Sequence, residues 1–371
     1  MRTDRFRTLV DEPGPFATVY YDNSHNTEDA SAVSELTVRS VLSDLDEQGA
    51  DATLKAAVEA ALTESAPPVG RSGRVVVVGP NGVVLDEQLI RPAVATEVRV
   101  SGLPYLVPVV EHGFERTSYA VAVVDHAGAD LAIHRVDRTD VATSVDAGGY
   151  PVHKASGAET SGYGDPQPRA EEAARKNLRA AADEIEQAVD RDDVGVVFIG
   201  GDDQARAELR RHLADRVRER AVDVEGVTRS ADSGTDNLRK RIDEQFAQRQ
   251  LSELESAIQR FREEEGTGRA AQGLAGVTAA LRSGNVDTLI VGDLAGRTVA
   301  SADGVVAPDA DTLSQYGAGD SAIVPADEAL PAAAIRVDAS IVRTDERFAP
   351  DDGIAAVLRF DEFSSADAAT R

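Results

Sequence analysis

Runs of apolar residues divide the first third of the chain into predicted strands and helices. β-Branched and aromatic runs predict strands, and apolar positions at helical spacing predict helices. The predicted elements are strands at 16–21, 74–78 and 83–85, and helices at 30–45 and 54–62. The turn at Gly79-Pro80-Asn81-Gly82 joins the last two strands as a hairpin. Residues 1–116 are therefore expected to form a small α/β domain.

The middle of the chain again contains predicted strands and helices, with one long irregular stretch between them. The predicted elements are strands at 119–124, 130–134 and 194–199, and helices at 169–189 and 205–220. Residues 146–168 are rich in glycine, serine and proline and form a predicted loop. Loops of this length inside a compact domain are usually functional or disordered. We expect residues 117–236 to form a second α/β domain that carries this loop.

The last third again alternates helical and strand patterns. The predicted elements are helices at 238–265 and 274–281, and strands at 286–291, 332–342 and 353–360. Residues 237–371 are expected to form a third domain. The fold class is therefore α/β, with three domains that each contain a small mixed sheet with flanking helices.

Composition and charge narrow the function classes. The 371 residues are 42% hydrophobic and carry a net charge of −26, with no cysteine. An acidic surface disfavours DNA binding, although charge can be segregated along a chain. No apolar run is long enough to span a membrane, and no apolar stretch follows the basic N-terminus as in a signal peptide. We expect a cytoplasmic monomer that binds neither DNA nor membranes.

Motifs for metal, nucleotide or nucleophilic chemistry are weak. His126 and His134 could face each other across a hairpin, but they are more simply strand residues. Gly200-Gly201-Asp202-Asp203 follows a strand, yet its carboxylates stand where a phosphate would bind, so Asp202 or Asp203 is predicted to cap a helix. Asp125 could belong to an acidic cluster or could be a turn residue. No cofactor and no metal are expected.

The predicted loop has a distinct composition. It contains Tyr150, His153, Lys154 and Tyr163, and Arg169 follows it directly. Glycines, cations and aromatic rings together suit contact with RNA, where phosphates meet cations and bases stack on rings. A surface loop without a ligand is the alternative, and composition by itself favours it.

Two stretches in the last third resemble a known superfamily. Residues 276–293 and the closing Gly-Ile-Ala-Ala-Val-Leu-Arg-Phe at 353–360 resemble the C-terminal domain of archaeal and eukaryotic release factors and of the rescue protein Pelota. Residues 119–134 and 194–203 resemble their middle domain. The first segment does not align with the decoding domain. Among the superfamily's bacterial members, the chain looks most like the Balon-type ribosome hibernation factors.

The resemblance implies a place for the loop on the ribosome. In release factors the corresponding loop carries Gly-Gly-Gln, which positions water on peptidyl-tRNA. Here Gly148 and Gly149 precede Tyr150, and Gln167 lies between prolines, so the triplet is absent. The implied contacts to ribosomal RNA near the peptidyl-transferase centre are Tyr150, His153, Lys154, Tyr163, Gln167 and Arg169. The implied decoding-centre candidates are Asn23, Ser24, His25 and Asn26, which could equally form an ordinary turn.

The resulting expectation is a non-catalytic hibernation factor that occupies the A site of idle ribosomes. It would contact the RNA of both ribosomal subunits and, by resemblance, meet a translational GTPase, elongation factor Tu. One alternative is a peptidyl-tRNA hydrolase or rescue factor in which Gln167 replaces the usual glutamine. A further alternative is a stress-related protein-interaction module that does not bind ribosomes.

Overall fold

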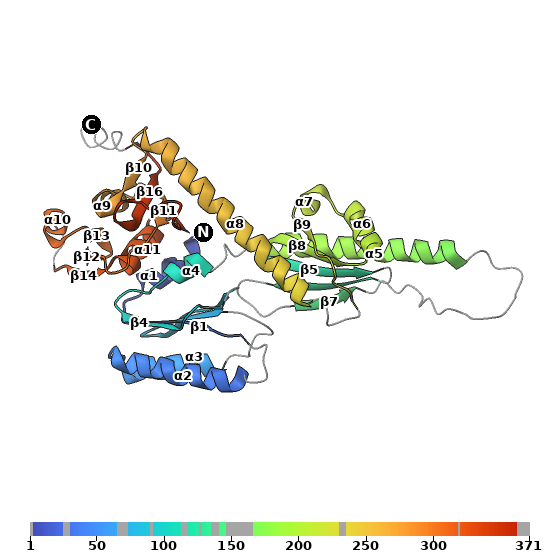
Figure 1. Cartoon of the computed structure of the whole chain (residues 1–371), viewed down its shortest axis with the longest axis horizontal. Coiled ribbons are helices and arrows are strands. Elements are labelled where there is room, and N and C mark those ends of the chain that lie inside the picture. Colours follow the sequence, from blue (N-terminus) through green and yellow to red (C-terminus); the bar gives the residue numbers. More distant parts are fainter. Residues whose placement is uncertain are drawn as a thin grey trace, which may run out of the picture. The chain divides into compact units, whose positions relative to one another are not determined.

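A computed structural model of the chain separates into two compact units. The structure describes residues 3–24, 30–64, 73–89, 92–112, 118–125, 128–134, 141–145, 166–229, 235–317 and 320–361. Unit 1 combines Met1–Glu115 with Gln248–Arg371, and unit 2 is Arg116–Ala247. Sheets with flanking helices make up both units (Figure 1), which confirms the expected α/β class, but the N-terminal sheet is wholly antiparallel and not mixed as expected. The expected division into three domains stays a prediction.

The N-terminal part of unit 1 is an antiparallel sheet in the order β3-β2-β1-β4. Its strands are β1 (Phe16–Asp22), β2 (Gly73–Gly79), β3 (Gly82–Leu89) and β4 (Glu97–Ser101). Its helices are η1 (Asp4–Phe6), α1 (Arg7–Asp11), α2 (Ala30–Glu47), α3 (Ala52–Glu64) and α4 (Val107–His112). The predicted strands and helices of this part are confirmed, whereas β4 was not predicted.

Both faces of this N-terminal sheet are buried. Alternate residues of β1, such as Ala17 and Val19, pack beneath α2 and α3 with Val41 and Leu45. The other face, with Phe16 and Tyr20, joins a core that extends into the C-terminal part of the chain. The two ends of the chain therefore share one hydrophobic core.

The C-terminal part of unit 1 contains two sheets. The larger has the order β10-β16-β11-β15, with β11 and β15 parallel, and the smaller has the order β13-β12-β14. The strands are β10 (Ala270–Gln272), β11 (Val286–Val291), β12 (Thr298–Ala302), β13 (Val305–Ala307), β14 (Ala322–Pro325), β15 (Ser340–Arg343) and β16 (Ile354–Leu358). The helices are α9 (Gly273–Arg282), α10 (Ala310–Gln315), α11 (Ala326–Arg336) and η3 (Asp351–Gly353).

One strand prediction in this part is wrong. Residues 332–342 were expected to form a strand, but α11 continues to Arg336 and only Ser340–Arg343 is a strand. Alanine is the strongest helix former, and α11 is alanine-rich and buried on nearly all sides. A helix buried all round shows no polar stripe, so its pattern resembles a buried strand.

A polar seam joins the two parts of unit 1 between β4 and the start of α11. The Arg99 guanidinium donates to Asp327 Oδ2 at 2.8 Å and lies 3.4 Å from the centroid of the Tyr105 ring. Ser101 Oγ donates a hydrogen bond to Glu328, whose side chain is 3% exposed. This group of side chains, which we call the seam, places paired charges beside the shared core.

Unit 2 is built on a five-stranded sheet in the order β7-β6-β5-β8-β9. Its strands are β5 (Ser118–Asp125), β6 (Gly128–His134), β7 (Val141–Val145), β8 (Val194–Gly201) and β9 (Ala221–Asp223). Its helices are α5 (Pro166–Asp192), α6 (Asp203–His212) and α7 (Asp215–Arg218), and the long α8 (Thr235–Glu265) begins in this unit. The helix predicted over 205–220 is interrupted at Leu213, the C-cap of α6.

Parallel strands β5 and β8 approach each other closely at one glycine. Gly201 has a φ of +120°, and a Cβ added there would lie 1.9 Å from the Val124 carbonyl oxygen. Only glycine fits this combination of a left-handed backbone and a close neighbour. On the sheet face away from α5, Tyr119 and Phe198 pack edge to face with centroids 5.9 Å apart, and Phe246 of α8 completes the cluster.

Candidate functional site

The predicted loop lies between β7 and α5 of unit 2. Tyr150, His153, Lys154 and Tyr163 fall outside the described residues. Helix α5 begins at Pro166, so the end of the expected loop, residues 166–168, is helical. Proline is well tolerated in the first helical turn, where its missing N–H would have no partner. Gln167 and Arg169 therefore lie at the start of α5 rather than on a loop.

Helix α5 is anchored by its second half and projects with its first turns. The buried positions Leu178, Ala182 and Ile185 recur at helical spacing and pack in the core formed with the sheet. Among the described side chains of α5, burial begins at Asn177. Figure 1 shows the start of α5, in green, extending beyond the ends of the strands. The segment that follows the predicted loop is thus a helical extension.

Charge is divided along the exposed side of α5. Arg175, Lys176 and Arg179 are exposed in its middle; Glu171 and Glu172 precede them in the sequence, and further acidic residues follow from Asp183 onward. Near the end of the helix, Glu186 accepts a hydrogen bond from the Ala214 amide at 2.6 Å, and Asp190 pairs with Arg216 at 2.9 Å. The acidic residues near the end therefore join α5 to the neighbouring helices of unit 2, and the three cations face solvent.

Asp125 has a structural role at the end of β5. Its Oδ1 accepts hydrogen bonds from the Gly128 amide and from Arg229, both at 3.0 Å. Arg229 also binds both carboxylate oxygens of Asp130, at 2.9 and 3.0 Å. Asp125 therefore acts as a turn residue held by an arginine. No group of three or more His, Asp or Glu side chains able to hold a metal occurs among the described residues.

The glycine-rich turn after β8 is capped by its own carboxylate. Asp202 Oδ1 accepts from the Gln204 and Ala205 amides at 3.0 and 3.2 Å, which confirms the predicted helix cap. These amides are the donors that would hold a phosphate at a helix N-terminus. Because Asp202 already occupies them, this turn is a structural element.

The structure describes two of the four decoding-centre candidates, Asn23 and Ser24. Asn23 is 7% exposed, and the Ser24 amide donates to Asp22 Oδ1 at 2.9 Å in a tight turn after β1. His25 and Asn26 fall outside the described residues. Because Asn23 is buried, only part of this turn can offer side chains to a ligand. The assignment to a decoding tip stays a prediction.

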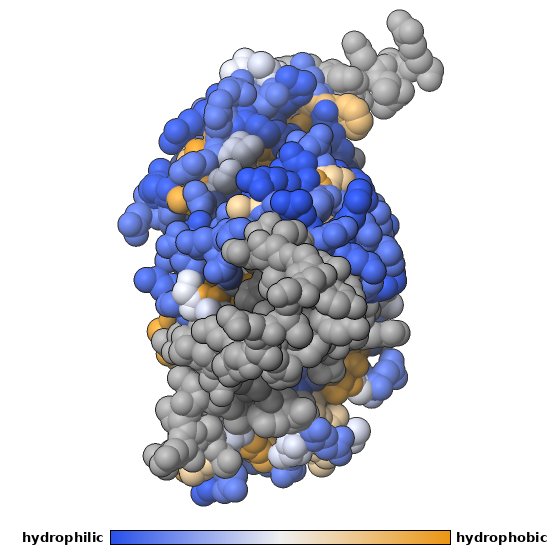
Figure 2. All heavy atoms as spheres, turned by 90° about the vertical axis from the view of Figure 1, so that its right-hand side faces the viewer, coloured by the Kyte–Doolittle hydropathy of each residue, from blue (hydrophilic) through white to orange (hydrophobic). Residues whose placement is uncertain are grey.

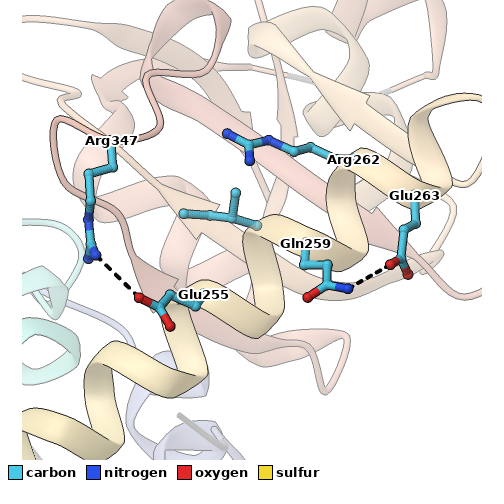
Figure 3. A pocket seen from close by; sticks show the side chains of 6 residues that line it. Glu255, Gln259, Arg262, Glu263 and Arg347 are labelled. Atoms are coloured by element: carbon cyan, nitrogen blue, oxygen red, sulfur yellow. Dashed lines mark hydrogen bonds and ion pairs between the residues drawn. The ribbon is translucent and has the colours of Figure 1, made fainter.

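A surface hollow of about 550 Å³ lies on α8 within unit 1 and was not predicted from the sequence. Figure 3 shows Arg347 directed to Glu255, at 3.5 Å, and Gln259 donating to Glu263, at 2.9 Å, on opposite sides of the hollow. Its two arginines, including Arg262, are balanced by two glutamates. The charges cancel, so the hollow favours no ligand of one sign.

Several buried ionisable groups with shifted pKa values lie at the seam and in the shared core beside it. Burial raises the pKa of Tyr105 to about 12, and burial raises the pKa of Tyr20 well above its ordinary value. Burial also raises the pKa of Glu328, against the hydrogen bond from Ser101 that lowers it. These groups lie inside packed structure and pair with each other. We therefore interpret them as parts of the fold.

The described surface is largely polar. Figure 2 shows hydrophilic residues over most of the described surface on the face it presents, with hydrophobic residues in separate patches. In the part of the chain that the structure describes, no helix is long and apolar enough to cross a membrane.

Comparison with known structures finds archaeal translation factors at low similarity. A structure named as a model of ribosome-bound archaeal Pelota and ABCE1 is 16% identical, covers 96% of this chain and 94% of that chain, and has a TM-score of 0.41. The crystal structure of Archaeoglobus fulgidus Pelota is 16% identical, covers 97% and 92%, and has a TM-score of 0.37. The archaeal termination factor aRF1 is 16% identical, covers 96% of both chains, and has a TM-score of 0.24.

Comparison of sequences gives the family. The uncharacterized protein Rv2629 of Mycobacterium tuberculosis strain H37Rv is 42% identical over 364 residues, which cover 97% of both chains. The protein MT2704 of strain CDC 1551 matches to the same extent. Residues 118–267, which include β5 to α8, match bacterial archaeo-eukaryotic release factor family 2. The chain therefore belongs to the family of these mycobacterial proteins, and its residues 118–267 are similar to bacterial archaeo-eukaryotic release factor family 2.

Proposed function

We propose that this chain binds the ribosomal A site of idle ribosomes and blocks translation without catalysing a reaction. One observation carries the proposal: residues 118–267 match a release-factor family, while the segment between β7 and α5 contains no Gly-Gly-Gln. A chain whose middle part matches a release-factor family and lacks the hydrolytic triplet would occupy the site and leave peptidyl-tRNA intact. The closeness to Balon-type hibernation factors is part of this proposal.

The proposal assigns two sets of contacts. Tyr150, His153, Lys154, Tyr163, Gln167 and Arg169 would approach ribosomal RNA beside the peptidyl-transferase centre. Asn23, Ser24, His25 and Asn26 would lie on the decoding side. Cations pair with phosphates and aromatic rings stack on unpaired bases, which is the chemistry that RNA offers.

Co-sedimentation with purified bacterial ribosomes tests the proposal. We expect the full chain to pellet with ribosomes at physiological salt, to saturate at one copy per ribosome, and to be displaced by aminoacyl-tRNA in the A site. Failure to pellet, or pelleting that A-site tRNA leaves unchanged, would contradict A-site occupation.

Release of the nascent chain separates occupation from hydrolysis. We expect no faster peptide release from a stalled ribosome–nascent-chain complex when the protein is added. The hydrolase alternative requires release that Gln167→Ala abolishes. Because Gln167 lies within the start of α5, this substitution should leave the fold intact.

Delivery by a translational GTPase is a separable part of the proposal. The resemblance to Pelota implies such a partner, and elongation factor Tu is the bacterial candidate. We expect elongation factor Tu with GTP to increase the rate of ribosome association without changing the final occupancy. Association rates that are equal with and without the GTPase would remove this part and leave A-site binding standing.

A further inference from the structure

Three exposed cations in the middle of α5 have no partner among the residues that the structure describes. No ion pair or hydrogen bond joins Arg175, Lys176 or Arg179 to any other residue in the part of the chain that the structure describes. The chain carries a net charge of −26 and contains only four lysines. Three of them within five residues form a local basic surface.

The neighbouring helices of the same unit show the contrast. Every arginine of α6 and α7 forms an ion pair with a carboxylate. Arg211, for example, meets Glu208 at 2.6 Å, and Arg218 meets Asp215 at 3.1 Å. Cations on these helices are neutralised within the unit, so the three on α5 are left to an external anion.

Helical geometry places the three cations on one side of α5. Residues three and four apart lie on the same face of a helix, so Arg179 lies beside both Arg175 and Lys176. Exposed Glu172 and Asp183 stand at the same spacing from these cations, so the surface combines three cations with two flanking acids. Asn177 and Leu178, on the opposite side of this segment, are buried, so the cations lie where α5 meets the core of unit 2 and their side chains remain exposed.

We propose that Arg175, Lys176 and Arg179 bind the phosphodiester backbone of RNA. The proposal deepens the proposed function and rests on it, since ribosomal RNA would be the RNA concerned. Cations grouped on one helix face pair with backbone phosphates and read no base sequence. The surface is distinct from the loop residues assigned above, because it consists of α5 side chains alone.

The test compares two triple variants of the full chain. The first is Arg175→Gln, Lys176→Gln and Arg179→Gln, which removes the basic surface. The matched control is Arg191→Gln, Arg211→Gln and Arg216→Gln, which removes the same charge from paired cations of the same unit. Glutamine is close to lysine and arginine in helix propensity, so both variants should fold. Far-UV circular dichroism checks the fold.

Ribosome affinity is measured for each protein over a range of salt concentrations. For the first variant we expect at least about tenfold weaker binding near physiological salt and a log–log salt slope smaller by about 2–3. The control should stay within about twofold of the wild-type affinity, because its cations are already occupied by carboxylates. Equal affinities and slopes for wild type and first variant would overturn the assignment and leave ribosome binding standing.

Two further arms distinguish other outcomes. If wild type does not bind ribosomes, the proposed function fails, and binding to protein-free ribosomal RNA then tests the three cations by themselves. Weaker RNA binding in the first variant only supports the assignment. RNA binding that is unchanged in the first variant overturns it. Flotation with phosphatidylglycerol-containing vesicles tests a lipid surface. Vesicle binding lost in the first variant, with RNA binding unchanged, would overturn the assignment in favour of a membrane.

Discussion

The seam of unit 1 and the first half of α5 use arginine in opposite ways. At the seam, Arg99 contacts Asp327 at 2.8 Å and Glu97 at 3.0 Å and stacks on Tyr105. On α5, Arg175 and Arg179 contact no carboxylate among the described residues. A cation enclosed by acids contributes to the fold, whereas a cation without them is free for a ligand. The pairing of an arginine therefore indicates its role better than its exposure does.

The largest expected effect in this comparison comes from replacing Arg99, the arginine of the seam. Arg99→Met leaves Asp327 and the buried Glu328 without their cation, and we expect a loss of about 3 kcal/mol in unfolding free energy. Urea denaturation followed by circular dichroism measures it, because the chain has no tryptophan. Arg39→Met removes an exposed pair with Glu35 and should change stability by less than about 1 kcal/mol. Equal losses in the two variants would contradict the structural role of the seam.

Gly201→Ala tests whether unit 2 can be destabilised while the stability of unit 1 stays unchanged. Gly201→Ala places a Cβ 1.9 Å from the Val124 carbonyl oxygen at a φ of +120°, and we expect a loss of about 2–3 kcal/mol. Hydrogen exchange should show the loss in β5 and β8, with the seam unchanged. The control is Gly266→Ala, since an added Cβ there meets nothing within 4 Å. Equal weakening of both units would mean that they unfold together.

Alkaline titration probes the tyrosines of the shared core. Burial raises the pKa of Tyr20 well above 10.0 and that of Tyr105 to about 12. The folded chain therefore holds these protons more tightly than the unfolded chain, so stability is full below the unfolded pKa of about 10 and falls as the pH rises beyond it. Urea denaturation at increasing pH and tyrosinate absorbance check this. Complete tyrosine ionisation near pH 10 in the folded protein would contradict it.

The smallest expected effect is at Glu328. Burial raises its folded pKa above the ordinary value of 4.5, so its contribution to stability is full below that value and is lost as the pH rises through the folded pKa. Glu328→Gln removes this titration and should make the stability curve flatter on the mildly acidic side of neutrality. At neutral pH we expect a change below about 1 kcal/mol, because the amide oxygen can still accept from Ser101. An unchanged pH dependence would show that Glu328 does not titrate in this range.

Most elements of the fold could be predicted where the local pattern was distinct. The valine run of β2 and the Gly-Pro-Asn-Gly turn after it are local signals, and both were identified. The strand β4 was missed because it is short and carries Glu97 and Arg99 among its few residues. Those polar residues face the seam. Arg99 contacts Asp327, more than two hundred residues away in the sequence, and no local sequence pattern predicts such a distant contact.

The candidate site was predictable in part. The composition of residues 146–168 drew attention to the segment between β7 and α5, whose role stays a prediction, and the missing Gly-Gly-Gln was visible directly. Arg175, Lys176 and Arg179 were also visible in the sequence, but they occur within an ordinary charged helix. Their lack of partners became apparent only when the acids that neutralise the arginines of α6 and α7 were located.

The shared core has a consequence for the order of events during synthesis. Residues 116–247 make up unit 2. All of them emerge from the ribosome before the C-terminal residues that pack against the N-terminal sheet have been synthesised. Phe16, Tyr20, Val75 and Val77 must wait for residues beyond 270 to cover them. The nascent chain thus completes its inserted unit first, with an apolar sheet face exposed meanwhile, and a chaperone would be needed most in that interval.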